Sequence, residues 1–171
     1  ILVIAGNGGM KDFETVGPWG TGIAAAEFGA QVTNIGANAF AGCENLTHVN
    51  VPNMEDWLAI RFENAEANPL CAGAALYIGG EEVTELVIPE GTTEIGAYAF
   101  QGGQFTSVTI PNSVTNIWAN AFAGCGNVRE VTLGGEFVIV SIYDPIGDWS
   151  EIGDFLCCRC RKGQKMPAIW I

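Results

Sequence analysis

His48 is the only histidine in this chain of 171 residues, and it is the first candidate for acid–base or nucleophilic chemistry. Such catalysis needs a base held beside a nucleophile. The segment from Leu46 to Val51 alternates apolar and polar residues, which predicts that His48 lies on the outer face of a strand. The sequence assigns it no serine or cysteine partner. We therefore interpret His48 as a surface histidine and expect no catalytic residues and no enzyme.

Two pairs of adjacent carboxylates are the next candidates, because paired carboxylates serve glycosidases and bind Ca²⁺. Glu55 and Asp56 lie in a short predicted helix, and Glu81 and Glu82 follow a Gly-Gly turn. Neighbouring side chains diverge both on a helix and at a hairpin. Solvated charges are therefore the better interpretation of both pairs.

Three thiols occur within four residues near the end of the chain, at Cys157, Cys158 and Cys160, and such a group can bind a soft metal or react with oxidants. A closed zinc site needs four ligands, usually in two separated pairs. Only Cys71 or His48, both distant in sequence, could complete the set. We predict no metal site and no cofactor.

The opening ILVIAGNGGM has the strand and the glycines of a dinucleotide-binding motif, followed by the alanine-rich GIAAAEFGAQV that could form its helix. The motif fails because Lys11 stands where the third glycine belongs, and because KDFETVGPWGTG, with Pro18, precedes any helix. The sequence favours a strand, a Gly-rich turn and an aromatic plug, Trp19, that caps the first repeat. Because the chain starts without Met in what reads as mid-strand, we expect it to be a fragment or a processed piece.

The net charge of −12 is unevenly distributed, since every acidic residue occurs by Asp154 and four of the seven basic residues follow it. Binding to nucleic acid or to an anionic membrane needs basic patches, so both partners are disfavoured. No apolar run is long enough to span a bilayer, and no leader peptide is visible. Basic partners remain compatible with this charge.

A twenty-residue pattern organises the chain. VTNIGANAFAGCENLTHVNV (32–51) and VTNIWANAFAGCGNVREVTL (114–133) agree at most positions, and TTEIGAYAFQGGQFTSVTI (92–110) is a degraded copy. Repetition of this kind is typical of a solenoid, in which each unit buries its apolar face against the next. Cys43 and Cys125 occupy the same place in two repeats, which favours buried packing residues over a disulfide.

Each repeat predicts a helical turn at ANAFAGC that directs a phenylalanine inward, followed by a strand at LTHVNVP. Stacking the copies should align two files of core residues: Phe40, Phe100 and Phe122, and Val51, Ile88, Ile110 and Leu133. Between Pro52 and Val83 an elaborated repeat interrupts the period. It predicts a short helix after Asn53, with Met54, Trp57 and Leu58 on one face, and then a Gly-Gly hairpin in LYIGGEEV.

The quoted repeats resemble the BspA-like leucine-rich repeats of bacterial surface proteins, whose unit reads approximately LxxVxIPxxVTxIGxxAFxGCxx. The resemblance covers Leu2 to about Leu133, although Trp118 replaces the turn glycine and Gly103 the cysteine. It implies a β-rich leucine-rich repeat solenoid with short helical turns, of the α/β right-handed superhelix type, with one short strand at LxxVxIP in each repeat. We expect a capping segment at 1–30, repeats at 31–133 with the elaborated one at 53–82, and C-terminal strands with a Cys-rich basic tail at 134–171.

The same resemblance implies a secreted or cell-surface protein that binds other proteins, including host extracellular-matrix or surface proteins. The outward strand positions are the candidate binding residues, and we expect them to form one polar ladder that includes two acidic positions: His48, Asn50, Glu85, Val87, Ser107, Thr109, Glu130 and Thr132. Two alternatives remain open. The protein could be a structural spacer in a larger surface protein, or an accessory domain of a secreted hydrolase.

Overall fold

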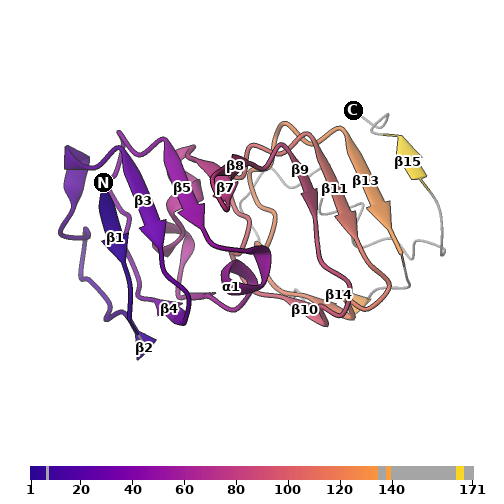
Figure 1. Ribbon diagram of the computed structural model, residues 1–171, viewed down its shortest axis with the longest axis horizontal. Helices are drawn as coiled ribbons and strands as arrows, with labels where there is room; N and C mark the ends of the chain where they lie inside the picture. Colours follow the sequence, from indigo (N-terminus) through magenta and orange to yellow (C-terminus); the bar gives the residue numbers. More distant parts are fainter. Residues whose placement is uncertain (7, 135–137, 140–164, 168–171) are drawn as a thin grey trace.

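The computed structural model describes residues 1–6 and 8–134, together with the backbone of residues 138–139 and 165–167. The predicted Cys157, Cys158 and Cys160 cluster lies outside these residues. Short strands follow one another along the long axis of the molecule, from the N-terminal β1 to the C-terminal β13 and β15 (Figure 1). Within the described part of the chain, every helix is too short or too polar to traverse a lipid bilayer.

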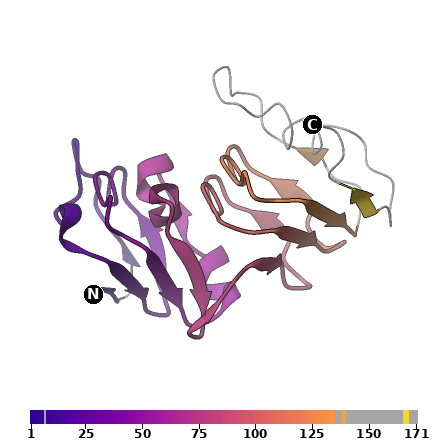
Figure 2. The ribbon, with the colours of Figure 1, turned by 90° about the horizontal axis from the view of Figure 1, so that it is seen from above.

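The strands predicted at LxxVxIP, together with other strands that were not predicted there, form two separate sheets. The first contains β1 (Leu2–Ile4), β3 (Ala25–Phe28), β5 (His48–Val51) and β7 (Ala75–Ile78), all parallel, and ends at β8 (Glu81–Glu82), which runs antiparallel to β7. The second contains the parallel strands β9 (Glu85–Val87), β11 (Ser107–Ile110) and β13 (Glu130–Leu133), with β15 (Lys165–Pro167) antiparallel to β13. Figure 2 shows the two sheets from above.

The repeats contain a second short strand, although the sequence predicts only one strand in each repeat. The second strands form two further parallel ladders: β2 (Gly8–Gly9), β4 (Val32–Ile35) and β6 (Arg61–Phe62), and β10 (Glu94–Ile95), β12 (Asn116–Ile117) and β14 (Val138–Ile139). Strands β4, β10 and β12 lie in the VTNI and TTEI segments of the repeats. The residue types of these segments explain why they are extended. β-Branched residues fit extended backbone, and Ile35, Ile95 and Ile117 are all buried there.

The expected helical turn at ANAFAGC is wrong. Residues 37–42 form successive tight turns, with Ala39 N–H donating to the Gly36 carbonyl at 3.3 Å and Ala41 N–H donating to the Asn38 carbonyl at 3.1 Å. Asn38 has a φ of +57°, in the left-handed region, which no α-helical turn contains. Phe40 is nevertheless directed inward and buried, as expected.

The elaborated repeat folds as the sequence indicates. Helix α1 (Met54–Leu58) begins after Asn53, whose side-chain oxygen accepts a 2.7 Å hydrogen bond from the backbone N–H of Asp56. Gly79 and Gly80, both with positive φ, form the hairpin between β7 and β8. Three short 3-10 helices complete the described helical structure: η1 (Gly20–Gly22), η2 (Ala65–Ala67) and η3 (Pro69–Ala72).

The alanine-rich segment near the N-terminus is a strand, β3, and not the helix that a dinucleotide-binding motif would need. β3 lies between β1 and β5 and buries Ala26 and Phe28. The predicted plug, Trp19, is half-buried and meets Phe13 edge-to-face at 6.3 Å between ring centroids.

The predicted phenylalanine file is continuous only in its second half. The rings of Phe100 and Phe122 stack at 5.5 Å, whereas Phe40 packs on Phe28 at 6.0 Å. The backbone N–H of Phe40 donates to the Glu66 carbonyl, so the η2 segment of the elaborated repeat lies beside Phe40, where the next phenylalanine was expected. The inserted residues therefore separate Phe40 from Phe100.

The file of aliphatic residues is divided in the same way. Val51 pairs with Ile78 in the first sheet, and Ile110 pairs with Leu133 in the second. The two parts are joined through the elaborated repeat, where the amide of Asn68, which is fully buried, donates to the carbonyls of Tyr98 and Ala99. Buried hydrogen bonds thus connect the repeats across the interruption of the sheets.

The cysteines of the repeats are buried and free, as their equivalent positions indicate. Cys43 is 1% exposed and Cys125 is 2% exposed. The thiol of Cys125 donates a 3.1 Å hydrogen bond to the Phe100 carbonyl. Burial raises the pKa of Cys125 to about 12, because the thiolate would lose its hydration. Both residues act as packing groups.

Candidate interaction surface

The outward side chains of β3, β5 and β7 and of β9, β11 and β13 form what we call the front face. The eight residues singled out from the sequence all lie on it, but they do not form one continuous ladder. His48 and Asn50 belong to the first sheet, and the other six belong to the second. The expectation of a single ladder is wrong because the β7–β8 hairpin ends the first sheet before β9 begins.

In the first sheet, His48 occupies a row between two small residues. It pairs in register with Ala25 on one side and Ala75 on the other. The next row contains Glu27, Asn50 and Tyr77. The His48 and Tyr77 rings stack across these rows, with centroids 5.1 Å apart and planes inclined by 23°. Because His48 is flanked by alanines, this aromatic pair stands open on the front face.

Polar contacts hold the aromatic pair in place. The Tyr77 hydroxyl donates to the Glu82 carboxylate at 3.4 Å, and Thr47 Oγ1 lies 2.7 Å from His48 Nδ1. Desolvation, and then the charge of Glu82 and its hydrogen bond, raise the pKa of Tyr77, so the phenol stays protonated near neutral pH. Asn50 accepts a 3.0 Å hydrogen bond from the Gly80 N–H. The strand and the hairpin therefore position the pair together.

In the second sheet, the predicted residues form two rows in register. Ser107 pairs with Glu85 and with Glu130, and Thr109 pairs with Val87 and with Thr132. The two carboxylate positions are two strands apart, roughly 10 Å, on either side of Ser107. Val87 is 58% exposed, which is unusual for a β-branched residue of a strand. This part of the face is acidic and hydroxyl-rich, with one exposed apolar step.

Sequence reasoning missed two residues of the front face, Glu27 and Tyr77, and the contact of Tyr77 with Glu82 of the adjacent hairpin strand. The missed signal was the alternation within AAEF and ALYI, where every second residue is apolar; Ala26, Phe28 and Leu76 are buried, and Ile78 is partly buried. AAEF was weighed as a possible helix, and ALYI was treated only as one arm of a hairpin. Aligning both segments with HVNV would have placed Glu27 and Tyr77 beside Asn50.

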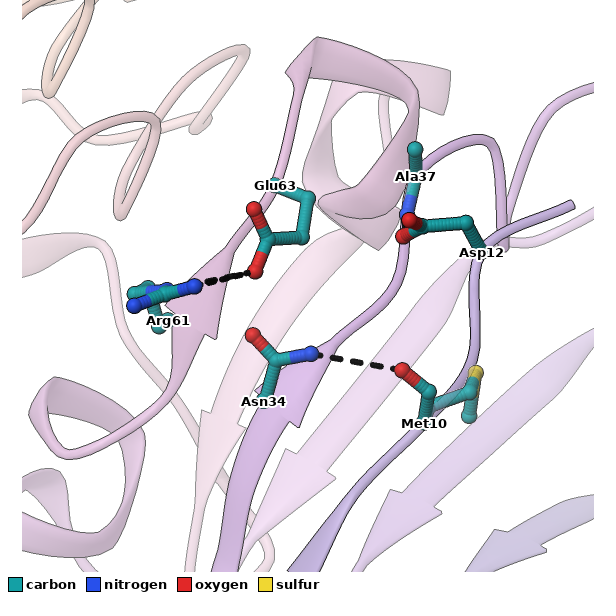
Figure 3. A network of polar contacts seen from close by, with 6 residues as sticks. All are labelled: Met10, Asp12, Asn34, Ala37, Arg61 and Glu63. Carbon is teal, nitrogen blue, oxygen red and sulfur yellow. Dashed lines mark hydrogen bonds and ion pairs between the residues drawn. The ribbon is translucent and has the colours of Figure 1, made fainter.

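Polar groups in and beside the β2–β4–β6 ladder bind other groups of the same fold. Figure 3 shows that Asn34 Nδ2 donates to the Met10 carbonyl at 3.3 Å and that Arg61 pairs with Glu63 at 2.6 Å. The Asp12 carboxylate accepts a 2.7 Å hydrogen bond from the Ala37 N–H. The hydrogen bond to Glu63, and then the charge of Glu63, raise the pKa of Arg61. These groups are therefore already engaged in contacts within the fold.

The carboxylate pairs do not converge into a catalytic or metal-binding group. Asp56 lies in the first turn of α1, and its carboxylate accepts a 2.8 Å hydrogen bond from the side-chain amide of the capping residue Asn53. Glu81 and Glu82 are adjacent on β8, so their side chains point to opposite faces. Among residues 1–6 and 8–134, no three histidine, cysteine or carboxylate side chains are grouped so that they could hold a metal ion.

The model of the "BspA type Leucine rich repeat region" family matches residues 20–66 and 74–143 in six copies, which is over half of the chain. No curated protein sequence matches the chain. The matched residues contain all eight predicted positions of the front face, as well as Glu27, Tyr77 and Glu82.

Solved structures of leucine-rich repeat proteins resemble this fold. A leucine-rich repeat protein from Eubacterium ventriosum has a TM-score of 0.52 at 24% identity, and the match covers 77% of this chain and 38% of that one. A leucine-rich repeat protein from T. pallidum has a TM-score of 0.43 at 18% identity, over 88% and 77% of the two chains. The chain thus spans well under half of the Eubacterium ventriosum protein, and the likeness concerns the fold alone.

Proposed function

Because this chain belongs to the BspA-type leucine-rich repeat family, we propose that it is a protein-interaction module whose front face binds a basic segment of another protein. The repeats would stack as a solenoid of the right-handed α/β type, which presents consecutive strands as one extended surface. We further propose that the module acts at the cell surface or outside the cell, in adhesion or in binding a host protein.

The observation that carries the proposal is the register of polar side chains on the front face. Glu27 and the His48–Tyr77 pair lie on the first sheet, and Glu85 and Glu130 flank Ser107 on the second. Residues 1–134 contain fourteen acidic residues and only three basic ones. Fixed negative charge on a rigid sheet favours a cationic partner and steers it during encounter.

The aromatic pair adds a second element of recognition. The exposed His48 ring and the partly exposed Tyr77 ring offer flat surfaces on which an arginine or lysine side chain can lie. Glu82 is hydrogen-bonded to Tyr77, and Glu27 is in the same row, so a cation over the rings would have carboxylates beside it. Aromatic residues with adjacent charge are frequent energetic centres of protein interfaces.

Saturable binding of the full chain to a panel of extracellular-matrix and host surface proteins tests the proposal. For a protein that binds, Glu85→Lys with Glu130→Lys should weaken affinity tenfold or more, because each reversal replaces an attraction with a repulsion of similar size. Tyr77→Ala should weaken it independently. The matched control is Glu14→Lys with Glu66→Lys, which makes the same change of net charge at exposed sites off the front face.

If the front-face variant and the matched control lose the same affinity, the loss follows from the change in net charge alone. That result would overturn the proposed binding face. A chain that binds nothing saturably in the panel would instead support the spacer function. Measuring the affinities at two ionic strengths separates the two parts of the face, since the contribution of Tyr77 should be less sensitive to salt than that of the carboxylates.

A further inference from the structure

β9 is a sheet edge in the middle of the chain. It pairs with β11 only, and the strand before it in the sequence, β8, turns back onto β7. The two front sheets therefore stop on either side of the short connection at Val83 and Thr84. In the view from above, the two sheets diverge from this connection (Figure 2).

The backbone of β9 presents unpaired groups at this edge. The Thr84 carbonyl accepts a 2.7 Å hydrogen bond from Thr106, and the Ile88 N–H donates a 2.9 Å hydrogen bond to Thr109, so residues 84 and 88 face β11. Peptide groups alternate along a strand, which turns those of Glu85 and Val87 to the other side. Within residues 1–6 and 8–134, no strand pairs with β9 on that side.

The side chains of β9 determine which residue types an added strand would need on its two faces. Leu86 is fully buried and faces the core, whereas Glu85 and Val87 are exposed on the front face. The other border of the interruption carries Glu81 and Glu82, both exposed. A strand beside β9 would therefore have negative charge near its outward residues and apolar core near its inward ones.

We propose that the free edge of β9 receives an extended segment of a partner protein by strand addition, and that this segment alternates basic and apolar residues. The proposal rests on the proposed function, because it states how the basic segment binds. Main-chain hydrogen bonds to Glu85 and Val87 would supply affinity. Lysine or arginine residues near Glu85 and Glu82, which shares the face of Tyr77, would supply specificity, and small apolar residues would pack beside Leu86.

The other edges are less suited to this partner. β8 has only two residues, both acidic, as in sheet edges that resist pairing. The outer edge of β13 is paired with β15. No described strand pairs with the outer side of β1, and its outward residue Val3 is 64% exposed, but its three residues include no acidic side chain.

The probe is a fluorescein-labelled octapeptide of alternating lysine and valine, titrated into the full chain by fluorescence anisotropy. Val87→Pro removes the outward N–H, and an edge strand tolerates proline when that N–H is not paired within the sheet. The matched control is Val3→Pro, because Gly29 N–H donates to the Ile4 carbonyl and so places the Val3 peptide groups outward as well. Peptide N-methylated on alternate residues is the second control.

We expect Val87→Pro and peptide N-methylation each to weaken binding tenfold or more, and Val3→Pro to change it less than twofold. Hydrogen exchange of the Val87 amide in the unmodified chain should slow at least tenfold when the octapeptide is bound, which tests the edge even if Val87→Pro fails to fold. Unchanged affinity in folded Val87→Pro, unchanged exchange at Val87, or no octapeptide binding would each overturn strand addition.

These failures are distinguishable from failure of the proposed function. Proteins from the binding panel that respond to Tyr77→Ala and to the Glu85 and Glu130 reversals, but not to Val87→Pro, would leave the front face as the binding surface and remove only the edge. If the octapeptide binds at β9 but no panel protein binds, strand addition at the edge is retained and the proposed function is removed.

Discussion

The indole Nε1 of Trp57 donates a 3.0 Å hydrogen bond to the backbone carbonyl of Ala99, forty-two residues along the chain. Trp57 is fully buried in helix α1, and its ring meets Phe28 and Phe62 at 5.9 Å and 5.2 Å. The bond joins the repeats of the first front sheet to those of the second, across the interruption between the two sheets. The elaborated repeat therefore replaces the missing strand pairing with a side chain anchored in both halves.

Trp57→Phe should lower the free energy of unfolding by about 2 kcal/mol, because it removes the buried donor to Ala99 and leaves a partly filled cavity. The matched control is Trp118→Phe, which removes an exposed indole hydrogen bond to Glu94 and should cost about 0.5 kcal/mol or less. Urea denaturation followed by circular dichroism measures both. Equal costs for the two variants would contradict the anchoring role of Trp57.

A second prediction concerns the left-handed residue of each repeat. Asn38, Tyr98 and Asn120 occupy equivalent positions and have φ values of +57°, +61° and +57°. Because a Cβ is strained in this region, Asn120→Gly should be more stable than Asn120→Ala by about 1 kcal/mol. At the neighbouring Ala119, whose φ is not positive, glycine should be less stable than alanine. Thermal unfolding of these variants and of the unmodified chain measures both differences. If glycine and alanine rank in the same order of stability at both positions, the left-handed conformation of Asn120 is refuted.

The third prediction follows from the raised pKa of Cys125. A thiol that ionises near pH 9 in the unfolded chain and at about 12 in the folded chain stabilises the fold fully below pH 9 and loses that contribution as pH rises toward 12. Cys125→Ala should cost about 1–2 kcal/mol at pH 7.5, because it removes the buried sulfur and its hydrogen bond to Phe100. By pH 10.5 the ionisation term reaches about 2 kcal/mol and offsets that cost.

The two proteins should therefore have similar stability at pH 10.5, although the variant is weaker at pH 7.5. Denaturation of both at pH 7.5, 9 and 10.5 under reducing conditions gives this difference, and Cys43 and Cys71 are present in both proteins. A stability difference that stays constant over this range would show that the Cys125 thiol does not resist ionisation.

Much of the local structure was predictable because it depends on short-range patterns. Asn53 followed by acidic residues predicts α1, the Gly-Gly pair predicts the β7–β8 hairpin, and the equivalence of Cys43 and Cys125 predicts buried thiols. The helical turn at ANAFAGC was wrong because the alanines favour a helix locally, whereas neighbouring repeats require Asn38 in a left-handed conformation. Its side chain donates to the Phe13 carbonyl and accepts from Asn64, contacts that local propensity does not contain.

By itself, the sequence determined the family, the repeated strands with their inward and outward residues, and the acidic character of the front face. Each follows from residue type and spacing alone, since the alternation of side chains along a strand is a local property. Only the tertiary structure decided that the face is divided, that Tyr77 stacks on His48, and that β9 is an unpaired edge. These depend on how the 53–82 segment packs between repeats, where Trp57 and Asn68 meet carbonyls that are distant in sequence.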